Sequence, residues 1–266
     1  MNDSNIFATC CDGQDLHDGE RIDEIGFGGR KLIQKPDDFC YGIDAVLLAD
    51  FAARRHKCRE NARTVIDLGT GTGIIPLILE YKIGAEKIYG IELQETSWER
   101  ACRNTVFNGL EKRISFINDD VGNFGSHMSE WGKKLKGQAD IVVSNPPYFE
   151  SGSGLINDRT PKMIARHETS AGLEAFMACA SHLLRPKGDF FMIHRPFRLT
   201  DICCFGRKNG LEPKELCFVS PKKDTAPNML LIHMVKGGGS ELKILENLYV
   251  YDDNGKYTPE ILKAYE

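Results

Sequence analysis

The sequence from Arg63 onward alternates between short apolar segments and amphipathic segments, and this alternation restricts the possible fold more than any other feature. The spacing of apolar residues predicts helices over residues 74–83, 95–108, 173–184 and 199–208. Between them it predicts short strands over residues 64–67, 87–92, 114–117, 139–144 and 188–194. Strands that alternate with helices form right-handed βαβ units around a parallel sheet. The chain is therefore expected to adopt an α/β fold.

The two ends of the sequence depart from this alternation. Residues 21–34 predict two short strands around a glycine-rich turn, and residues 43–53 have the apolar spacing of a helix. Two late strands, over residues 215–220 and 228–236, are expected to pair in antiparallel fashion and to close the sheet. We divide the chain into a flexible acidic N-terminus, an N-terminal extension packed on the core, a main domain and a C-terminal tail, over residues 1–20, 21–62, 63–250 and 251–266.

The composition excludes several classes of protein. Apolar residues make up 41% of the 266 residues and charged residues 27%, a balance typical of globular proteins and not of disordered or fibrous ones. The nine cysteines include no C-x-x-C pair, so neither a disulfide framework nor a metal site is expected. The first residues are polar and acidic, unlike a secretory signal, and no later stretch approaches the length of about 18 apolar residues that a membrane span requires. We expect a cytoplasmic monomer.

The segment Val65–Gly73 joins a predicted strand to a predicted helix through alternate glycines, Gly69-Thr70-Gly71-Thr72-Gly73. Glycine lets the backbone turn sharply and approach a ligand closely. A dinucleotide-binding turn has the spacing G-x-G-x-x-G, whereas the third glycine here comes one residue early. Asp67 precedes the first glycine, and a carboxylate at this position would repel a diphosphate but attract an ammonium group. The turn therefore favours an amino-acid moiety over a dinucleotide.

Acidic residues also end the next two predicted strands. Glu92 occupies the position at which a carboxylate in a nucleotide-binding βαβ unit accepts the ribose hydroxyls. Asp119 and Asp120 follow the next strand, where a carboxylate can accept from the exocyclic amine of adenine, and Asp120 is the first choice. Three acids at three consecutive strand ends suit adenosine and an amino acid with no phosphate, which describes S-adenosylmethionine. The alternative is a tight βα turn with ordinary surface acids.

A stiff proline motif, Asn145-Pro146-Pro147-Tyr148, follows the strand over residues 139–144. The prolines fix φ and remove two backbone donors, so the carbonyl oxygens of the loop can accept from a ligand. An amide or exocyclic NH2 is a poor nucleophile, but two oxygens that each accept one of its N–H bonds can aim its lone pair at a sulfonium methyl. We predict that Asn145 and Pro146 supply these oxygens and that Tyr148 stacks on the target base. The alternative is that the two prolines simply form a turn and that Tyr148 is a core residue.

The net charge of −4 argues against indiscriminate binding to polyanions, but the charge is unevenly distributed. Between Arg159 and Lys223, twelve Lys and Arg residues accompany six Asp and Glu residues, a local balance of +6. Residues 151–169 of this stretch have the composition of a long functional loop. We predict that basic residues at the rim of the active site bind RNA phosphates, and the substrate-binding candidates are Lys162, Arg166, His167, Arg195 and Arg198. The alternative is that they are solvated surface residues.

With these motifs, the sequence resembles the class I S-adenosylmethionine-dependent methyltransferases, in particular the N6-adenine branch that carries Asn-Pro-Pro-Tyr. Further segments are similar to the bacterial tRNA methyltransferases that modify adenine 37 of a valine tRNA: GIDAVLLADFA, PYFE, IARHE, MIHRPFRL and APNMLLIHMVKGGG. The resemblance implies a Rossmann-like, mostly parallel sheet of seven strands whose last strand is antiparallel. It also implies a cofactor site formed by Asp67, Gly69, Thr70, Gly71, Gly73, Glu92 and Asp120, and places Gly42 and Asp44 near the cofactor carboxylate or the target loop.

Two other functions are consistent with the same motifs. An enzyme with the same chemistry could instead methylate a release-factor glutamine or the N2 atom of an rRNA guanine. Such enzymes commonly carry an extra N-terminal domain, for which the roughly 20 residues before the first recognisable segment leave no room. A protein of another class would hold the cofactor or RNA without transferring a methyl group, and the intact Asn145 and Tyr148 argue against it. We therefore predict methylation of tRNA with S-adenosylmethionine as the cofactor.

Overall fold

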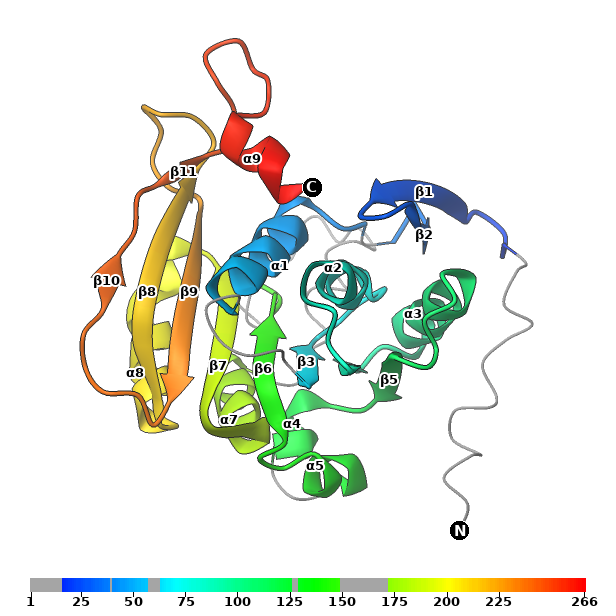
Figure 1. Ribbon diagram of the computed structural model, residues 1–266, viewed down its shortest axis with the longest axis horizontal. Helices are drawn as coiled ribbons and strands as arrows, with labels where there is room; N and C mark the ends of the chain where they lie inside the picture. The colour runs from blue at the N-terminus through cyan, green and yellow to red at the C-terminus, as the bar shows by residue number, and fades with distance from the viewer. Residues whose placement is uncertain (1–15, 39, 57–62, 126–128, 149–171) are drawn as a thin grey trace, which may run out of the picture.

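The computed structural model describes residues 16–38, 40–56, 63–125, 129–148 and 172–266. Its centre is one nine-stranded sheet in the order β10-β8-β9-β7-β6-β3-β4-β5, with β11 also paired to β8 (Figure 1). In chain order the strands of this sheet are β3 Thr64–Leu68, β4 Lys87–Glu92, β5 Ile114–Asn118, β6 Ala139–Ser144, β7 Leu184–His194, β8 Leu211–Ser220, β9 Met229–Lys236, β10 Lys243–Ile244 and β11 Leu248–Tyr249.

The pairing within this sheet confirms the predicted α/β class. Strands β7, β6, β3, β4 and β5 run parallel, and β9 runs antiparallel to both of its neighbours, β7 and β8. Seven strands were expected, and the two additional ones, β10 and β11, have two residues each and pair parallel with β8. The order reverses at β3, which lies between β4 and β6, so the loops after β3 and β6 leave the sheet on opposite sides. In open α/β sheets, ligands bind at such a switch point.

Helices cover both faces of the sheet because successive strand residues alternate between two apolar layers. In β3, for example, Val65 belongs to the core under one face and Ile66 to the core under the other, and both are fully buried. The first face is covered by α1 Ile43–His56, α2 Ile74–Ile83 and α3 Glu95–Phe107 (Figure 1). The second is covered by α4 Val121–Gly125, α7 Leu173–Leu183 and α8 Leu199–Lys208, and the short α5 Glu130–Lys134 packs against α4.

The N-terminal hairpin, β1 Arg21–Gly26 and β2 Arg30–Gln34, is attached to the core by two asparagines, one in α3 and one at its C-cap. The Asn108 amide accepts from the Lys31 amide N–H at 3.0 Å and donates to the Lys31 carbonyl at 2.7 Å. Asn104 does the same for Ile33, and its Nδ2 also donates to the Thr72 carbonyl at 3.0 Å. The two side chains thus satisfy the backbone of β2 as a neighbouring strand would.

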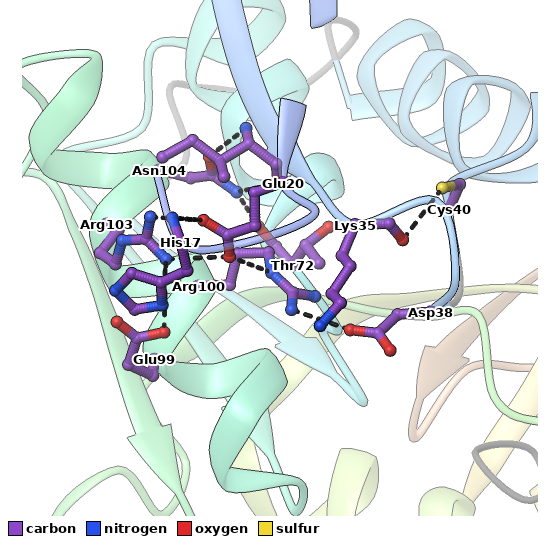
Figure 2. A network of polar contacts seen from close by, with 11 residues as sticks. His17, Glu20, Lys35, Asp38, Cys40, Thr72, Glu99, Arg100, Arg103 and Asn104 are labelled. Atoms are coloured by element: carbon purple, nitrogen blue, oxygen red, sulfur yellow. Dashed lines mark hydrogen bonds and ion pairs between the residues drawn. The ribbon is translucent and has the colours of Figure 1, made fainter. Parts of the chain in front are cut away.

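A buried ion-pair network holds the chain just before the hairpin (Figure 2). The Glu20 carboxylate accepts from Arg103 at 2.6 Å and from Arg100 at 3.1 Å, and the second arginine also bonds Asp38 at 2.8 Å. Burial opposes ionisation of Glu20, but the hydrogen bonds from Arg103, the His17 amide and Arg100 outweigh it and lower the pKa of Glu20 to about 2. The carboxylate is therefore charged at all physiological pH values.

The C-terminal segment returns to the helical face that carries α1. Helix α9 Pro259–Ala264 contacts α1 and buries Ile261 and Ala264. Tyr265 stacks with Phe27 of the hairpin turn at a ring separation of 6.3 Å. The tail therefore packs against both α1 and the N-terminal hairpin. Among the described residues, no helix has both the length and the hydropathy needed to cross a bilayer.

Candidate active site

A pocket opens at the switch point of the sheet, and four consecutive parallel strands contribute to its wall. The lining comprises residues after β3, β4, β5 and β6, the start of α1, and Phe176 of α7. Of the sequence-predicted residues, the pocket brings together Gly42, Asp44, Gly69, Thr70, Gly71, Glu92, Asp120, Asn145, Pro146, Pro147 and Tyr148. Asp67, Gly73 and Asp119 are not part of its wall.

The three glycines after β3 have different structural roles. All three have positive φ angles, +72° at Gly69, +58° at Gly71 and +83° at Gly73. A Cβ at Gly71 would meet no protein atom within 4 Å, so this glycine keeps the pocket open for a ligand. A Cβ at Gly73 would lie 2.7 Å from the Phe116 ring, so the third glycine is required by helix packing rather than by a ligand.

Glu92 lies at the end of β4 with both carboxylate oxygens held by backbone amides. One oxygen accepts from Gly71 N–H and the other from Gln94 N–H, each at 2.8 Å. Burial raises the pKa of Glu92, and the hydrogen bonds from Gln94 and Gly71 oppose this rise. A carboxylate has about four acceptor positions, and the N–H groups of Gln94, Gly71 and Leu93 occupy part of them, so acceptor capacity remains for a ligand in the pocket.

Asp67 lies behind the glycine turn, fully buried. Within the described part of the chain, no hydrogen bond of normal geometry reaches either of its carboxylate oxygens. Burial raises the pKa of Asp67 to about 7, the Thr70 hydroxyl opposes the rise and the Glu92 carboxylate adds to it. The side chain is therefore not positioned to contact an ammonium group in the pocket directly.

The two aspartates after β5 are separated by their hydrogen bonds. The Asp119 carboxylate turns back to accept from the Asp120 amide at 2.8 Å. The Asp120 carboxylate accepts from the Gly122 amide in the first turn of α4, also at 2.8 Å, and lines the pocket. Asp120 is thus the acid of this pair that faces the pocket.

The proline corner after β6 is tied to the start of α1 through a tyrosine hydroxyl. Tyr148 Oη donates to Asp44 Oδ2 at 2.8 Å and lies 2.9 Å from Asn145 Oδ1. The other oxygen of Asp44 accepts from the Ala45 amide at 3.0 Å, which fixes the carboxylate at the helix N-terminus. Sequence reasoning placed Asp44 near the cofactor or the target loop, and the structure shows its direct bond to Tyr148 of the Asn-Pro-Pro-Tyr motif. No spacing in the sequence indicates this link across more than a hundred residues.

Two residues at the end of β7 pack around the Tyr148 ring. The Arg195 guanidinium lies over the ring at 4.5 Å from its centroid, and its Nη1 donates to the Asn228 carbonyl at 2.9 Å. The His194 ring meets the tyrosine edge to face at 5.4 Å. Burial and then the charges of Arg198 and Arg195 lower the pKa of His194 to about 4, so its imidazole is neutral at physiological pH. One face of Tyr148 is therefore occupied by an arginine.

The other predicted RNA-binding residues are distributed differently. Arg198 pairs with Asp201 at 2.7 Å and is largely buried. Lys162, Arg166 and His167, with the rest of the expected loop over 151–169, lie outside the described residues. Several other basic residues of the same stretch form ion pairs on the outer surface, namely Arg185 with Asp140, Arg207 with Glu212 and Lys208 with Glu174. The described part of the +6 stretch therefore does not gather around the pocket as a whole.

Ten pocket residues were not candidates from the sequence: Tyr41, Ala45, Thr72, Ile74, Ile75, Leu93, Gln94, Ser97, Val121 and Phe176. Leu93, Gln94 and Ser97 follow Glu92 within five residues, so their proximity to the pocket could have been inferred from the sequence. Tyr41 precedes Gly42 in the same way. Phe176 comes from α7 on the other face of the sheet, and only the folded chain brings it to the glycine turn.

Comparison with known proteins agrees with this geometry. The family model for ribosomal protein L11 methyltransferase (PrmA) matches residues 53–146. A tRNA1(Val) (adenine(37)-N6)-methyltransferase of Porphyromonas gingivalis strain W83 is 30% identical over 227 residues, which cover 85% of this chain and 86% of the relative. The chain belongs to this family. As a tRNA1(Val) (adenine(37)-N6)-methyltransferase family member, it is an enzyme of the methyltransferase class.

Solved structures support the fold of this family member. A predicted O-methyltransferase from Agrobacterium tumefaciens superposes with a TM-score of 0.67 at 19% identity, covering 84% of this chain and 95% of that protein. A geranyl diphosphate methyltransferase solved in complex with S-adenosylmethionine gives a TM-score of 0.52 at 13% identity, covering 72% of this chain and 85% of that protein. Both show the Rossmann-like architecture of class I methyltransferases.

Proposed function

We propose that this enzyme transfers the methyl group of S-adenosylmethionine to the exocyclic N6 of an adenine in tRNA, with adenine 37 of a valine tRNA as the target. The observation that carries the proposal is that the Asn145–Tyr148 corner lines the same pocket as Gly71 and Glu92. The curated relatives with which the chain aligns over most of its length bear the name of this activity.

The half of the pocket beside β3, β4 and β5 fits S-adenosylmethionine. Gly71 leaves space that a side chain would fill, and the lone pairs of Glu92 suit the two ribose hydroxyls. Asp120 suits the adenine amine. When bound, S-adenosylmethionine supplies a sulfonium methyl group to an attacking lone pair. The carboxylates of this half of the pocket would repel a phosphate-bearing cofactor.

The half of the pocket beside β6 suits a planar amine. The Tyr148 hydroxyl has one proton, and the Asp44 carboxylate is a stronger acceptor than the Asn145 amide, so this proton goes to Asp44. The Asn145 amide is then most stable with its O and N positions exchanged, so that its NH2 faces the tyrosine oxygen. This orientation leaves Oδ1 for the adenine amine. The Pro146 carbonyl accepts the second N–H bond. These two acceptors orient the N6 lone pair, and methyl transfer depends on this alignment. As the N–C bond forms, the S–C bond would break with the neutral thioether as leaving group, and N6 would release one proton to water.

A direct test combines substrate and site. Purified enzyme is incubated with tritiated S-adenosylmethionine and either bulk tRNA, rRNA or a release factor, and labelled nucleosides are identified by mass spectrometry. We expect N6-methyladenosine in tRNA. Label confined to the release factor or to guanine would replace the proposed acceptor, and no label in any acceptor would favour a non-catalytic binding protein.

The variant Asn145→Ala provides the matched control for this test. Because Asn145 acts on the acceptor, the substitution should abolish methyl transfer while affinity for S-adenosylmethionine changes by no more than a few-fold. A large loss of cofactor affinity would instead assign Asn145 to the donor half of the pocket.

A further inference from the structure

An exposed phenylalanine lies beside the active site. Phe197 belongs to a short 3-10 helix, η1 Pro196–Arg198, which begins two residues after the end of β7. Of the Phe197 surface, 69% is exposed. Among the described residues, this is the highest exposure of any large apolar side chain. A phenylalanine so exposed gains nothing from burial in the folded protein, whereas exposed aromatic rings are frequent where a protein binds another molecule.

The position of Phe197 is fixed relative to the catalytic corner. Two residues before it, Arg195 stacks on the Tyr148 ring and is anchored to the Asn228 carbonyl. The Cα atoms of residues 195 and 197 can be at most about 7 Å apart. Arg195 precedes the turn with extended backbone and packs on Tyr148, and Arg198 pairs with Asp201, whereas the Phe197 side chain between them is exposed. The ring therefore lies just beyond the arginine that borders the pocket.

The charge beside Phe197 favours a polyanion. Arg195 donates to a carbonyl oxygen at its anchoring contact, so its positive charge is not neutralised there. Two residues away, Phe197 offers the flat face that a nucleobase prefers. An exposed aromatic ring beside a cation is the combination with which proteins bind single-stranded nucleic acid.

We infer that Phe197 stacks on the base next to the target adenine while Arg195 faces the adjoining phosphate. This inference rests on the proposed function. An adenine that enters the pocket leaves its stack, and its neighbour loses one stacking partner. Phe197 replaces that partner at the rim, which lowers the cost of extruding the target.

The test uses anticodon stem-loop RNAs and three variants. Phe197→Leu removes the ring, Phe197→Trp retains a stacking face, and Tyr81→Leu removes another exposed aromatic ring, one on α2 outside the pocket wall, as the control. Phe197→Leu should weaken RNA binding by about 5- to 150-fold, the range expected for loss of one base–aromatic stack. Phe197→Trp and Tyr81→Leu should bind as the wild type does, and all variants should keep wild-type affinity for S-adenosylmethionine.

Stem-loops that lack one base identify the stacking partner. When the base on one side of the target adenine is removed, wild type and Phe197→Leu should bind equally, because the ring has lost its partner; removal of the base on the other side should preserve their difference. Equal binding of wild type and Phe197→Leu to the complete stem-loop, with methylation intact, would refute the inference and leave the proposed function standing. Absence of both binding and methylation by the wild type would refute both.

Discussion

Replacement of Asp67 by asparagine should remove a pH dependence from the stability of this enzyme. The carboxyl group is fully buried, and its pKa is raised from 3.8 to about 7, with burial as the largest cause. Between these two pH values the folded state holds a proton that the unfolded state has lost. Stability attributable to Asp67 therefore falls as pH rises from about 4 through about 7. Asparagine has nearly the same shape and cannot ionise.

The magnitude follows from the two pKa values. One pKa unit corresponds to about 1.4 kcal/mol, so the full difference amounts to about 4 kcal/mol once both states are ionised. About 2 to 3 kcal/mol of this falls between pH 5 and pH 8, because the unfolded carboxyl is already ionised at pH 5. Relative to the wild type, Asp67→Asn should therefore gain about 2 to 3 kcal/mol of unfolding free energy over this interval.

The assay is urea unfolding of the protein at pH 5, 6, 7 and 8 without S-adenosylmethionine, followed by circular dichroism. Asp140→Asn is the control, since Asp140 accepts hydrogen bonds from Arg63 and Thr64 on the neighbouring strand and should leave the Asp67 contribution in place. Parallel curves for wild type and Asp67→Asn would show that the buried carboxyl is ionised at pH 5 and would refute the reasoning.

Three further predictions concern the pocket and the N-terminal network. Glu92→Gln should weaken S-adenosylmethionine binding at least roughly 10-fold in calorimetry. Both oxygens of Glu92 accept from backbone N–H groups, and the NH2 of a glutamine must face one of these donors, a loss of about 1.5–3 kcal/mol. Unchanged affinity would remove Glu92 from the ribose site. Tyr148→Phe should lower kcat with little change in cofactor affinity, and Asp44→Asn should reproduce the effect in part; a change confined to KM for the cofactor would contradict this positioning role. Glu20→Gln should cost about 3–5 kcal/mol in urea unfolding because it removes the buried carboxylate charge that faces both Arg103 and Arg100; a loss below about 1 kcal/mol would show that solvent screens the network.

Most of the sheet could be predicted because its strands are buried on both faces and its helices on one. Val65 and Ile66 are adjacent in β3 and both are fully buried, so the strand has successive apolar residues rather than a strict alternation. The turn after β3 was recognisable because positive φ angles favour glycine, so the turn appears in the sequence as three glycines at alternate positions. By contrast, the two-residue strands β10 and β11 are too short to form any periodic pattern, and their pairing with β8 depends on the folded core.

The roles of individual site residues were harder to predict than their location. Asp67 and Gly73 belong to the same motif as Gly71, yet one is buried behind the turn and the other packs against Phe116. Spacing along a strand end cannot distinguish a side chain that faces the ligand from one that faces the core. The bond from Tyr148 to Asp44 likewise depends on how α1 packs on the face of the sheet.

The short strands after β9 cover part of the open border of the sheet. Without them, the ten-residue β8 would present a row of unsatisfied amide and carbonyl groups at the open border of the sheet, next to β9. Such a border is a template for cross-molecular strand addition and fibre growth. Residues 243–249 occupy part of it, with Leu245 and Val250 donating their amides to Leu216 and Ser220. Shortening the chain before residue 243 would therefore open this border of the sheet and would also remove α9 from its place on α1.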